Sequence, residues 1–192
     1  MRDLDVRLAV RRRLNELHRG DLDTRIVEEM GVWAGSVRID IAVINGELCG
    51  FELKSDRDTL ERLPAQAAIY NRVFDRVELV VGQRHAAKAK ALVPSWWGIT
   101  IASESSGGVC LALERKGDVS PTRDAKLIAH LLWKDEAIEV LDLFGLAKGW
   151  RSKPVGLLHE RLAYELPFDE LRQAVRCKLK ARVKWLGKPV AN

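Results

Sequence analysis

Several residue types are scarce in this chain of 192 residues, and each scarcity excludes a kind of protein. Only three cysteines are present, Cys49, Cys110 and Cys177, and they are widely spaced and odd in number. This set predicts reduced thiols in a cytoplasmic protein without a zinc cluster. The four histidines also lack the spacing of metal ligands.

Long apolar runs and glycine-rich loops are missing as well. No stretch approaches the length of a membrane span, and the first ten residues are too charged for a signal peptide. Without a glycine-rich phosphate loop, no nucleotide cofactor is expected. The 47% hydrophobic content suffices for one core with a helical appendage. We therefore expect no membrane association and a cytoplasmic location.

The most informative segment is a two-faced β-hairpin around Asn45-Gly46, with arms at residues 37–44 and 47–54. Alternation along a strand puts successive side chains on opposite faces. On one face it predicts a core side with Ile39, Ile41 and Val43 from the first arm and Cys49, Phe51 and Leu53 from the second. On the other face it predicts Arg38, Asp40, Ala42, Glu52 and Lys54, with Gly50 leaving open space beside them.

The length of the turn decides whether these polar groups meet. A two-residue loop would pair Asp40 with Phe51 and mix core and polar residues on both faces. A three-residue loop with Gly46 in the left-handed conformation, or a bulge near Gly50, keeps Asp40, Glu52 and Lys54 together. We expect the longer loop, with Ile44 opposite Leu48 or Val43 opposite Glu47.

The pattern of Asp40, eleven residues and then Glu52-Leu53-Lys54 resembles the core motif of the restriction-endonuclease-like PD-(D/E)xK nucleases. The resemblance covers roughly residues 1–115, and Ile39 stands where the family has its proline. A second Glu-x-Lys, Glu114-Arg115-Lys116, has no hairpin partner that offers an aspartate. A solvated hairpin face is the alternative interpretation.

The resemblance implies a Mg²⁺- or Mn²⁺-dependent (endo)deoxyribonuclease, a phosphodiester hydrolase that acts in DNA repair or in defence against phages and mobile elements. Endo- or exonucleolytic action stays open, as does RNA in place of DNA as the substrate. Asp40 and Glu52 would bind the metal, and Lys54 would orient the attacking water. A third acidic ligand would come from upstream, and Glu29 is favoured over Glu28. Whether residues 24–31 form a helix or a strand stays open, as does the alternative that both glutamates are surface charges.

A Gln-x-x-x-Tyr pair follows the hairpin at Gln66 and Tyr70. Residues four apart share a helix face. The pair resembles the motif after Glu-x-Lys in RecB-like nucleases, which implies that both residues lie against the active site. The alternative is an ordinary amphipathic helix.

The fold is expected to be α/β, with a restriction-endonuclease-like mixed central β-sheet flanked by helices and an all-helical basic C-terminal extension. Residues 1–118 would form the nuclease-like core, and residues 119–192 a helical extension packed on it. The expected helices are 4–17, 64–74, 85–92, 121–144, 154–164 and 168–186. The first carries Arg7, Arg11, Arg12 and Arg13 on its outer side, and a capping box at 58–61 precedes the second. The expected strands after the hairpin are 77–82, 97–102 and 109–113, with a loop at 103–108.

Basic residues are concentrated near the end of the chain. Residues 145–192 hold eleven Lys or Arg against four Asp or Glu, whereas residues 1–144 hold 21 against 23. Arg172, Arg176, Lys180 and Lys184 form a stripe on the last helix, which is suited to a DNA backbone, with Arg38 and Arg57 nearer the site. A solvated helix face is the alternative for the stripe.

Two rival functions of the whole protein remain: an inactive nucleic-acid-binding protein that retains the nuclease fold, and a toxin-like or defence component. A homodimer is compatible with the sequence.

Overall fold

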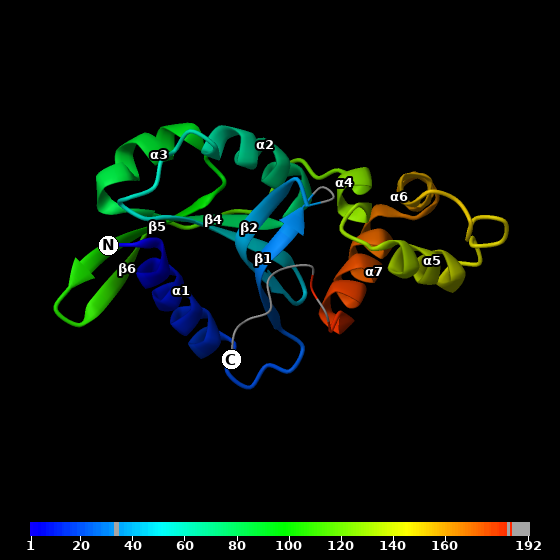
Figure 1. Ribbon diagram of the computed structural model, residues 1–192, viewed down its shortest axis with the longest axis horizontal. Coiled ribbons are helices and arrows are strands. Elements are labelled where there is room, and N and C mark those ends of the chain that lie inside the picture. The colour runs from blue at the N-terminus through cyan, green and yellow to red at the C-terminus, as the bar shows by residue number, and fades with distance from the viewer. Residues whose placement is uncertain (33–34, 184, 186–192) are drawn as a thin grey trace.

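The computed structural model describes residues 1–32, 35–183 and 185, which form a six-stranded sheet with helices on both faces and at one end (Figure 1). The strands are β1 (Arg25–Val32), β2 (Val37–Ile44), β3 (Leu48–Lys54), β4 (Arg76–Gly82), β5 (Gly98–Ser105) and β6 (Gly108–Arg115). The helices are α1 (Asp3–Leu17), α2 (Leu63–Val73), α3 (Ala86–Leu92), α4 (Ala125–Ala129), α5 (Lys134–Leu143), α6 (Val155–Glu165) and α7 (Phe168–Ala181), with a 3₁₀ turn, Gln83–His85, before α3.

The sheet is mixed, and its strand order follows the chain from β1 to β6. The strands β1, β2 and β3 are antiparallel, β3, β4 and β5 are parallel, and β6 returns antiparallel to β5. The parallel pairs arise because α2 and α3 are the crossover connections, as a βαβ unit requires. The predicted mixed α/β architecture is therefore confirmed. None of the described helices is long and apolar enough to cross a membrane.

Both faces of the central strands β3 and β4 are largely buried, as is usual when helices cover each side of parallel strands. Helix α1 packs its buried residues Val6, Val10 and Leu14 on one face, against Ile41 and Phe51 among others. Helices α2 and α3 lie across the opposite face (Figure 1).

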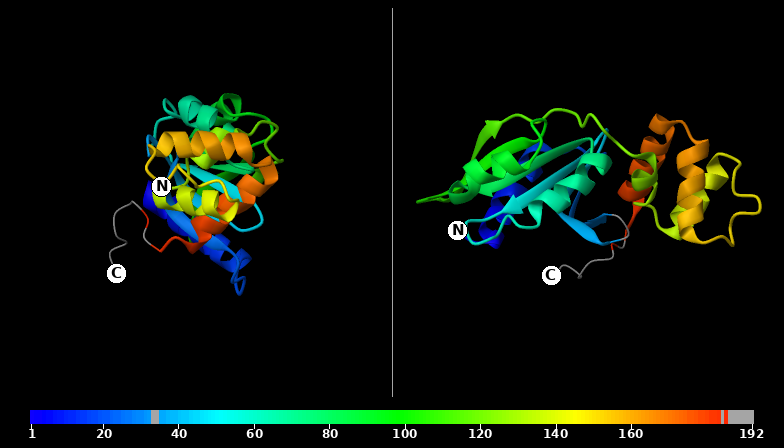
Figure 2. Two further views of the ribbon diagram at one scale, coloured as in Figure 1. Left: turned by 90° about the vertical axis from the view of Figure 1, so that its right-hand side faces the viewer. Right: turned by 90° about the horizontal axis from the view of Figure 1, so that it is seen from above.

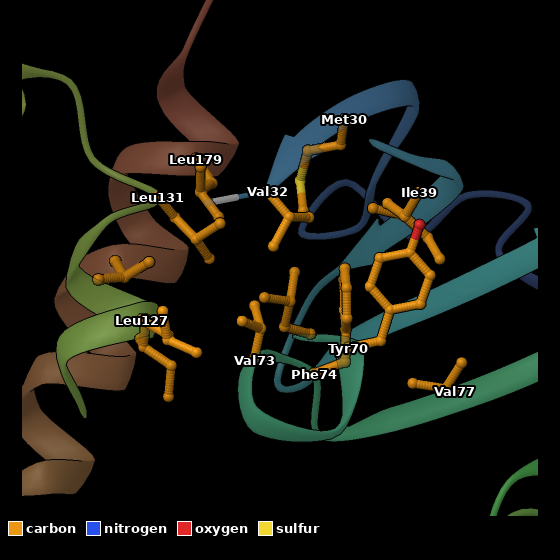
Figure 3. Close-up of a cluster of buried hydrophobic side chains, with 14 of the residues drawn as sticks. Met30, Val32, Ile39, Tyr70, Val73, Phe74, Val77, Leu127, Leu131 and Leu179 are labelled. Carbon is orange, nitrogen blue, oxygen red and sulfur yellow. The ribbon is translucent and has the colours of Figure 1, made fainter. Parts of the chain in front are cut away.

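The helices α4 to α7 gather at the end of the sheet near β1 and β2 (Figure 2). Their core is continuous with that of the sheet. In Figure 3, Leu127 of α4 and Leu179 of α7 belong to the same buried cluster as Val32 of β1 and Phe74. The helical region therefore shares one hydrophobic core with the sheet.

A buried carboxyl group reinforces this contact. Asp75, at the start of β4, is 2% exposed and accepts a hydrogen bond from the backbone N–H of Leu48 at 2.8 Å. Its other oxygen accepts from Arg123, at 2.8 Å, and from Arg172 of α7. Asp75 therefore links two strands to the segment before α4 and to α7.

Several predicted elements differ from the structure; the helix expected at 168–186, for example, ends at Ala181. The helix expected at 121–144 is two helices, because the chain turns at residues 130–133 between α4 and α5. The loop expected at 103–108 is largely strand, since β5 and β6 pair as far as Ser105 and Gly108. The capping box at 58–61 is absent, because the carboxylate of Asp58 accepts from the backbone N–H and hydroxyl of Ser55 at 2.7 Å instead.

The hairpin turn has the predicted length. Ile44 pairs with Leu48, which leaves a three-residue loop. Gly46 is not left-handed, contrary to the prediction. The carboxamide oxygen of Asn45 accepts from the N–H of Glu47 at 3.0 Å, and the N–H of Asn45 donates to the carbonyl of Glu47. An Asx-type turn thus closes the loop without a glycine conformation.

Gly50 leaves no open space, contrary to the prediction. A Cβ atom at this position would lie 3.2 Å from two ring atoms of Phe74 and 3.3 Å from Cδ1 of Ile39. The absence of a side chain therefore lets α2 approach the centre of the hairpin closely. This packing holds the helix that carries Gln66 and Tyr70 against β3.

Replacing Gly50 with alanine should destabilise the protein by about 1–3 kcal/mol, because the added methyl group overpacks this contact. Gly46→Ala is the matched control in the same hairpin. Its Cβ would meet no heavy atom of the described residues within 4 Å, so the change should stay within about 0.5 kcal/mol. Urea unfolding measures both variants, and equal stabilities would contradict the packing role of Gly50.

Candidate carboxylate site

Asp40 lies where the regular alternation of β2 breaks. Ile39 belongs to the core under α2, whereas Ile41 and Val43 belong to the core under α1. The prediction that these three share one face is therefore wrong. Between the two faces, the Oδ2 atom of Asp40 accepts from the N–H of Leu53 at 2.7 Å. Asp40 thus points toward β3, and continuing the Ile41–Phe51 register places it opposite Glu52.

Glu52 is almost completely buried, with 1% of its surface exposed. Its Oε1 atom accepts from Lys54 and, at 2.7 Å, from the side-chain amide of Gln66. Its Oε2 atom lies 3.1 Å from the hydroxyl of Tyr70, which also contacts the carbonyl oxygen of Arg38. Gln66 and Tyr70 reach Glu52 together because they are four residues apart on α2. Glu52 therefore has a partner on its own strand and two on the helix.

Arg7 of α1 connects Asp40 to the first strand. Its guanidinium donates to Oδ1 of Asp40 at 2.9 Å and forms an ion pair with Glu29 at 2.9 Å. Residues 25–32 form a strand, in which Glu28 pairs with Ile41 and Met30 pairs with Ile39 on either side of Glu29 and Asp40. Glu28 contacts Arg11 at 2.9 Å and Arg7 at 3.8 Å. Both glutamates therefore approach α1, although a regular strand would direct them to opposite faces.

Arg7 is the main residue that the sequence interpretation misplaced. It was expected on the outer side of its helix, yet its side chain is 14% exposed and meets several carboxylates. Two signals were available in the sequence. Arg7 adjoins the apolar stripe at Val6 and Val10, and it follows Asp3 at the i,i+4 spacing of helical ion pairs.

The surroundings of Asp40 and Tyr70 displace the pKa values of both side chains. Burial, and then the nearby charge of Glu52, raises the pKa of Asp40 to about 7, although the N–H of Leu53 and the charge of Arg7 act in the opposite direction. Burial and Glu52 also raise the pKa of Tyr70. The phenol is therefore a hydrogen-bond donor at neutral pH, and Asp40 gains or loses a proton in that range.

Two of the six predicted nucleic-acid contacts form ion pairs within the chain. Arg172 pairs with the buried Asp75 and with Asp169, and Lys180 pairs with Asp23. Arg176 is half-buried on α7, and Lys184 lies outside the described residues. Arg38 and Arg57 are exposed, on β2 and on the loop after β3. Whether these six residues contact DNA stays a prediction.

Comparison with known proteins identifies the family. The sequence model of the family described as bacteriophage P4 protein cII matches residues 5–186. The chain belongs to this family. It is similar to protein cII of Enterobacteria phage P4, with 29% identity over 160 residues. These residues are 83% of this chain and 60% of the phage protein, so the match spans less than two thirds of the curated relative. No solved structure matches the chain.

Membership of the P4 cII family overturns the assignment to the PD-(D/E)xK nucleases, because a different family covers nearly the whole chain. The inferred nuclease function is wrong with it, and so is the alternative of an inactive protein that retains the nuclease fold. The motif misled because its requirements are local. A hairpin followed by a helix brings two carboxyl groups, a lysine, an amide and a phenol together through strand alternation and i,i+4 spacing alone.

The raised pKa of Asp40 makes a prediction about stability. The pKa of Asp40 is about 7 in the folded protein and near 3.8 when the side chain is exposed in the unfolded chain. As pH rises, Asp40 therefore loses its proton at a lower pH in the unfolded state than in the folded state. Asp40 therefore reduces stability progressively from about pH 4 to pH 7, and the effect is constant above that range. Asp40→Asn removes this dependence. Between pH 5 and pH 8, the variant should gain about 2 kcal/mol of unfolding free energy relative to the parent. Chemical denaturation at several pH values measures the difference, and parallel pH profiles would contradict it.

Proposed function

We propose that this member of the P4 cII family binds a divalent cation, Mg²⁺ or Mn²⁺, at Asp40 and Glu52. One observation carries the proposal. Two carboxyl groups lie close together on neighbouring strands, and burial, followed by the charge of Glu52, raises the pKa of Asp40 to about 7. A bound cation would favour the ionised form of Asp40, because its positive charge would offset the lost hydration of this carboxylate and the repulsion by Glu52.

The local charges support this proposal. Five carboxyl groups belong to the connected cluster, those of Asp3, Glu28, Glu29, Asp40 and Glu52. They face three basic side chains, those of Arg7, Arg11 and Lys54. When all eight groups are ionised, the cluster carries an excess of two negative charges, which one divalent cation would neutralise.

The donor set favours magnesium or manganese over zinc. The described residues contain no group of three or more His, Cys, Asp or Glu side chains arranged to hold a metal. A tetrahedral zinc site would need more protein ligands. Magnesium keeps several waters and is commonly held by only one or two carboxylates. Asp40 and Glu52 meet this smaller requirement.

Whether the protein is an enzyme stays a prediction. A divalent cation, when bound, lowers the pKa of coordinated water and attracts anionic ligands. The chain itself supplies fixed donors: Lys54 and Gln66 hold the orientation of Glu52, and Tyr70 stays protonated beside it. DNA and a second copy of the chain stay predicted partners. The cytoplasmic location is also a proposal, supported by the free state of the three cysteines.

Titration of the purified protein with MgCl₂ and MnCl₂ in a calorimeter tests cation binding. We expect one site in the millimolar range or tighter, and at least a tenfold loss of affinity in Asp40→Asn and in Glu52→Gln, because each variant loses a charged ligand. Asp135→Asn is the control, since it removes an exposed carboxylate from α5. Absence of binding, or equal binding by all variants, would reject the site.

Proton release gives a second readout of the same event. Asp40 must be ionised to bind the cation, and below about pH 7 it is mostly protonated. Binding at pH 6 should therefore release more protons than binding at pH 8.5. Calorimetry in two buffers of different ionisation enthalpy measures this number. A release that is independent of pH would show that Asp40 is not a ligand.

A further inference from the structure

Arg7 already occupies the position of a cation at this site. Its side chain donates to both the carboxylate and, at 3.2 Å, the backbone carbonyl of Asp40. It also lies 2.9 Å from Glu29, 3.5 Å from Asp3 and 3.8 Å from Glu28. One guanidinium thus faces four carboxylates from α1, β1 and β2.

From this geometry we infer that Arg7 is a built-in competitor of the divalent cation, an inference that rests on the proposed function. The free lone pairs of Asp40 could accept a metal while Arg7 remains, but the guanidinium and the cation would then repel each other across a few ångströms of partly desolvated space. Cation binding therefore requires Arg7 to leave Asp40.

The movement involves the side chain and leaves the helix in place. Val6, Val10 and Leu14 are buried against the sheet and fix α1. Arg7 sits on the rim of this contact with a long, flexible stem. Asp3, one turn earlier on α1, is already 3.5 Å away and offers the displaced guanidinium an alternative partner at the surface.

Glu29 is released by the same movement. Among the described residues it is the one non-glycine with a positive φ, 52°, a conformation in which few glutamates are found. It lies between the paired residues Glu28 and Met30, and Arg7 bridges the side chains of Glu29 and Asp40. When Arg7 withdraws, the carboxylate of Glu29 becomes available as an additional acidic ligand. The position of Arg7 thus determines whether the carboxylates of Asp40 and Glu29 are available to a cation.

Substitution of Arg7 tests the competition. In Arg7→Met the apolar stem remains while the charge and donors are lost, so Mn²⁺ and Mg²⁺ should bind at least tenfold more tightly than to the parent. Arg11→Met is the matched control. It removes the same charge from the same helix, one turn later, but Arg11 contacts Glu28 and not Asp40. Arg11→Met should change the affinity by less than threefold.

Each outcome decides one of the two proposals. If the parent binds and Arg7→Met binds no more tightly than Arg11→Met, competition is rejected while the cation site stands. If only Arg7→Met binds, Arg7 blocks the site as inferred, and the proposed cation binding by the parent protein is rejected. If neither binds, the proposed function itself fails. Should Arg7→Met not fold, Arg7→Lys provides the test, because a lysine makes fewer of these contacts. Its affinity should exceed that of the parent, and an unchanged value would overturn the inference.

Discussion

The arrangement around the site depends on the burial of one carboxyl group, that of Glu52. A charge that is removed from water is tolerated only when partners replace the lost hydration. Lys54 supplies a charge, and Gln66 and Tyr70 supply donors from α2. These contacts tie the helix to the strand, and the missing side chain at Gly50 lets the helix come close enough to make them. The polar contacts of Glu52 and the apolar packing around Gly50 thus hold α2 in the same position on the sheet.

The buried carboxyl group of Asp75, at the opposite end of β3 from Glu52, is stabilised by a different set of partners. Its partners are two arginines from the helical region and a backbone N–H from β3. Both oxygens are engaged within the chain, so this carboxyl group connects parts of the fold. Arg172 shows the consequence: a residue of the predicted DNA-binding stripe lies 17% exposed against Asp75. A basic pattern along a helix does not reveal which of its members have acidic partners elsewhere.

The local geometry of the site and the family of the protein are separate questions. The motif correctly indicated that Asp40, Glu52, Lys54, Gln66 and Tyr70 lie in one region, because register and helical periodicity follow from spacing. It did not indicate the correct family, which a match over residues 5–186 assigned instead. Five side chains indicate which chemistry a site can support. Membership of a family is instead recognised from similarity along the whole sequence.

By itself, the sequence determined the elements with strong local signals. These are the amphipathic helix α1, the hairpin with its three-residue loop, the strand β4 and the succession of strands and helices that gives a mixed α/β fold. Each depends on periodicity, turn chemistry or the position of a proline, and these act between near neighbours in the chain. The break at residues 130–133 and the length of β5 and β6 could not be read in this way, because packing and strand pairing decided them.

Only the tertiary structure decided the surroundings of Asp40. Its position between the two faces, the approach of Arg7 from α1 and the unusual backbone of Glu29 all depend on segments distant in sequence. So does the pKa of Asp40, since burial and the charge of Glu52 raise it. Electrostatic energies depend on distances in space and on exposure to water, and neither quantity is encoded in the spacing of residues along a chain.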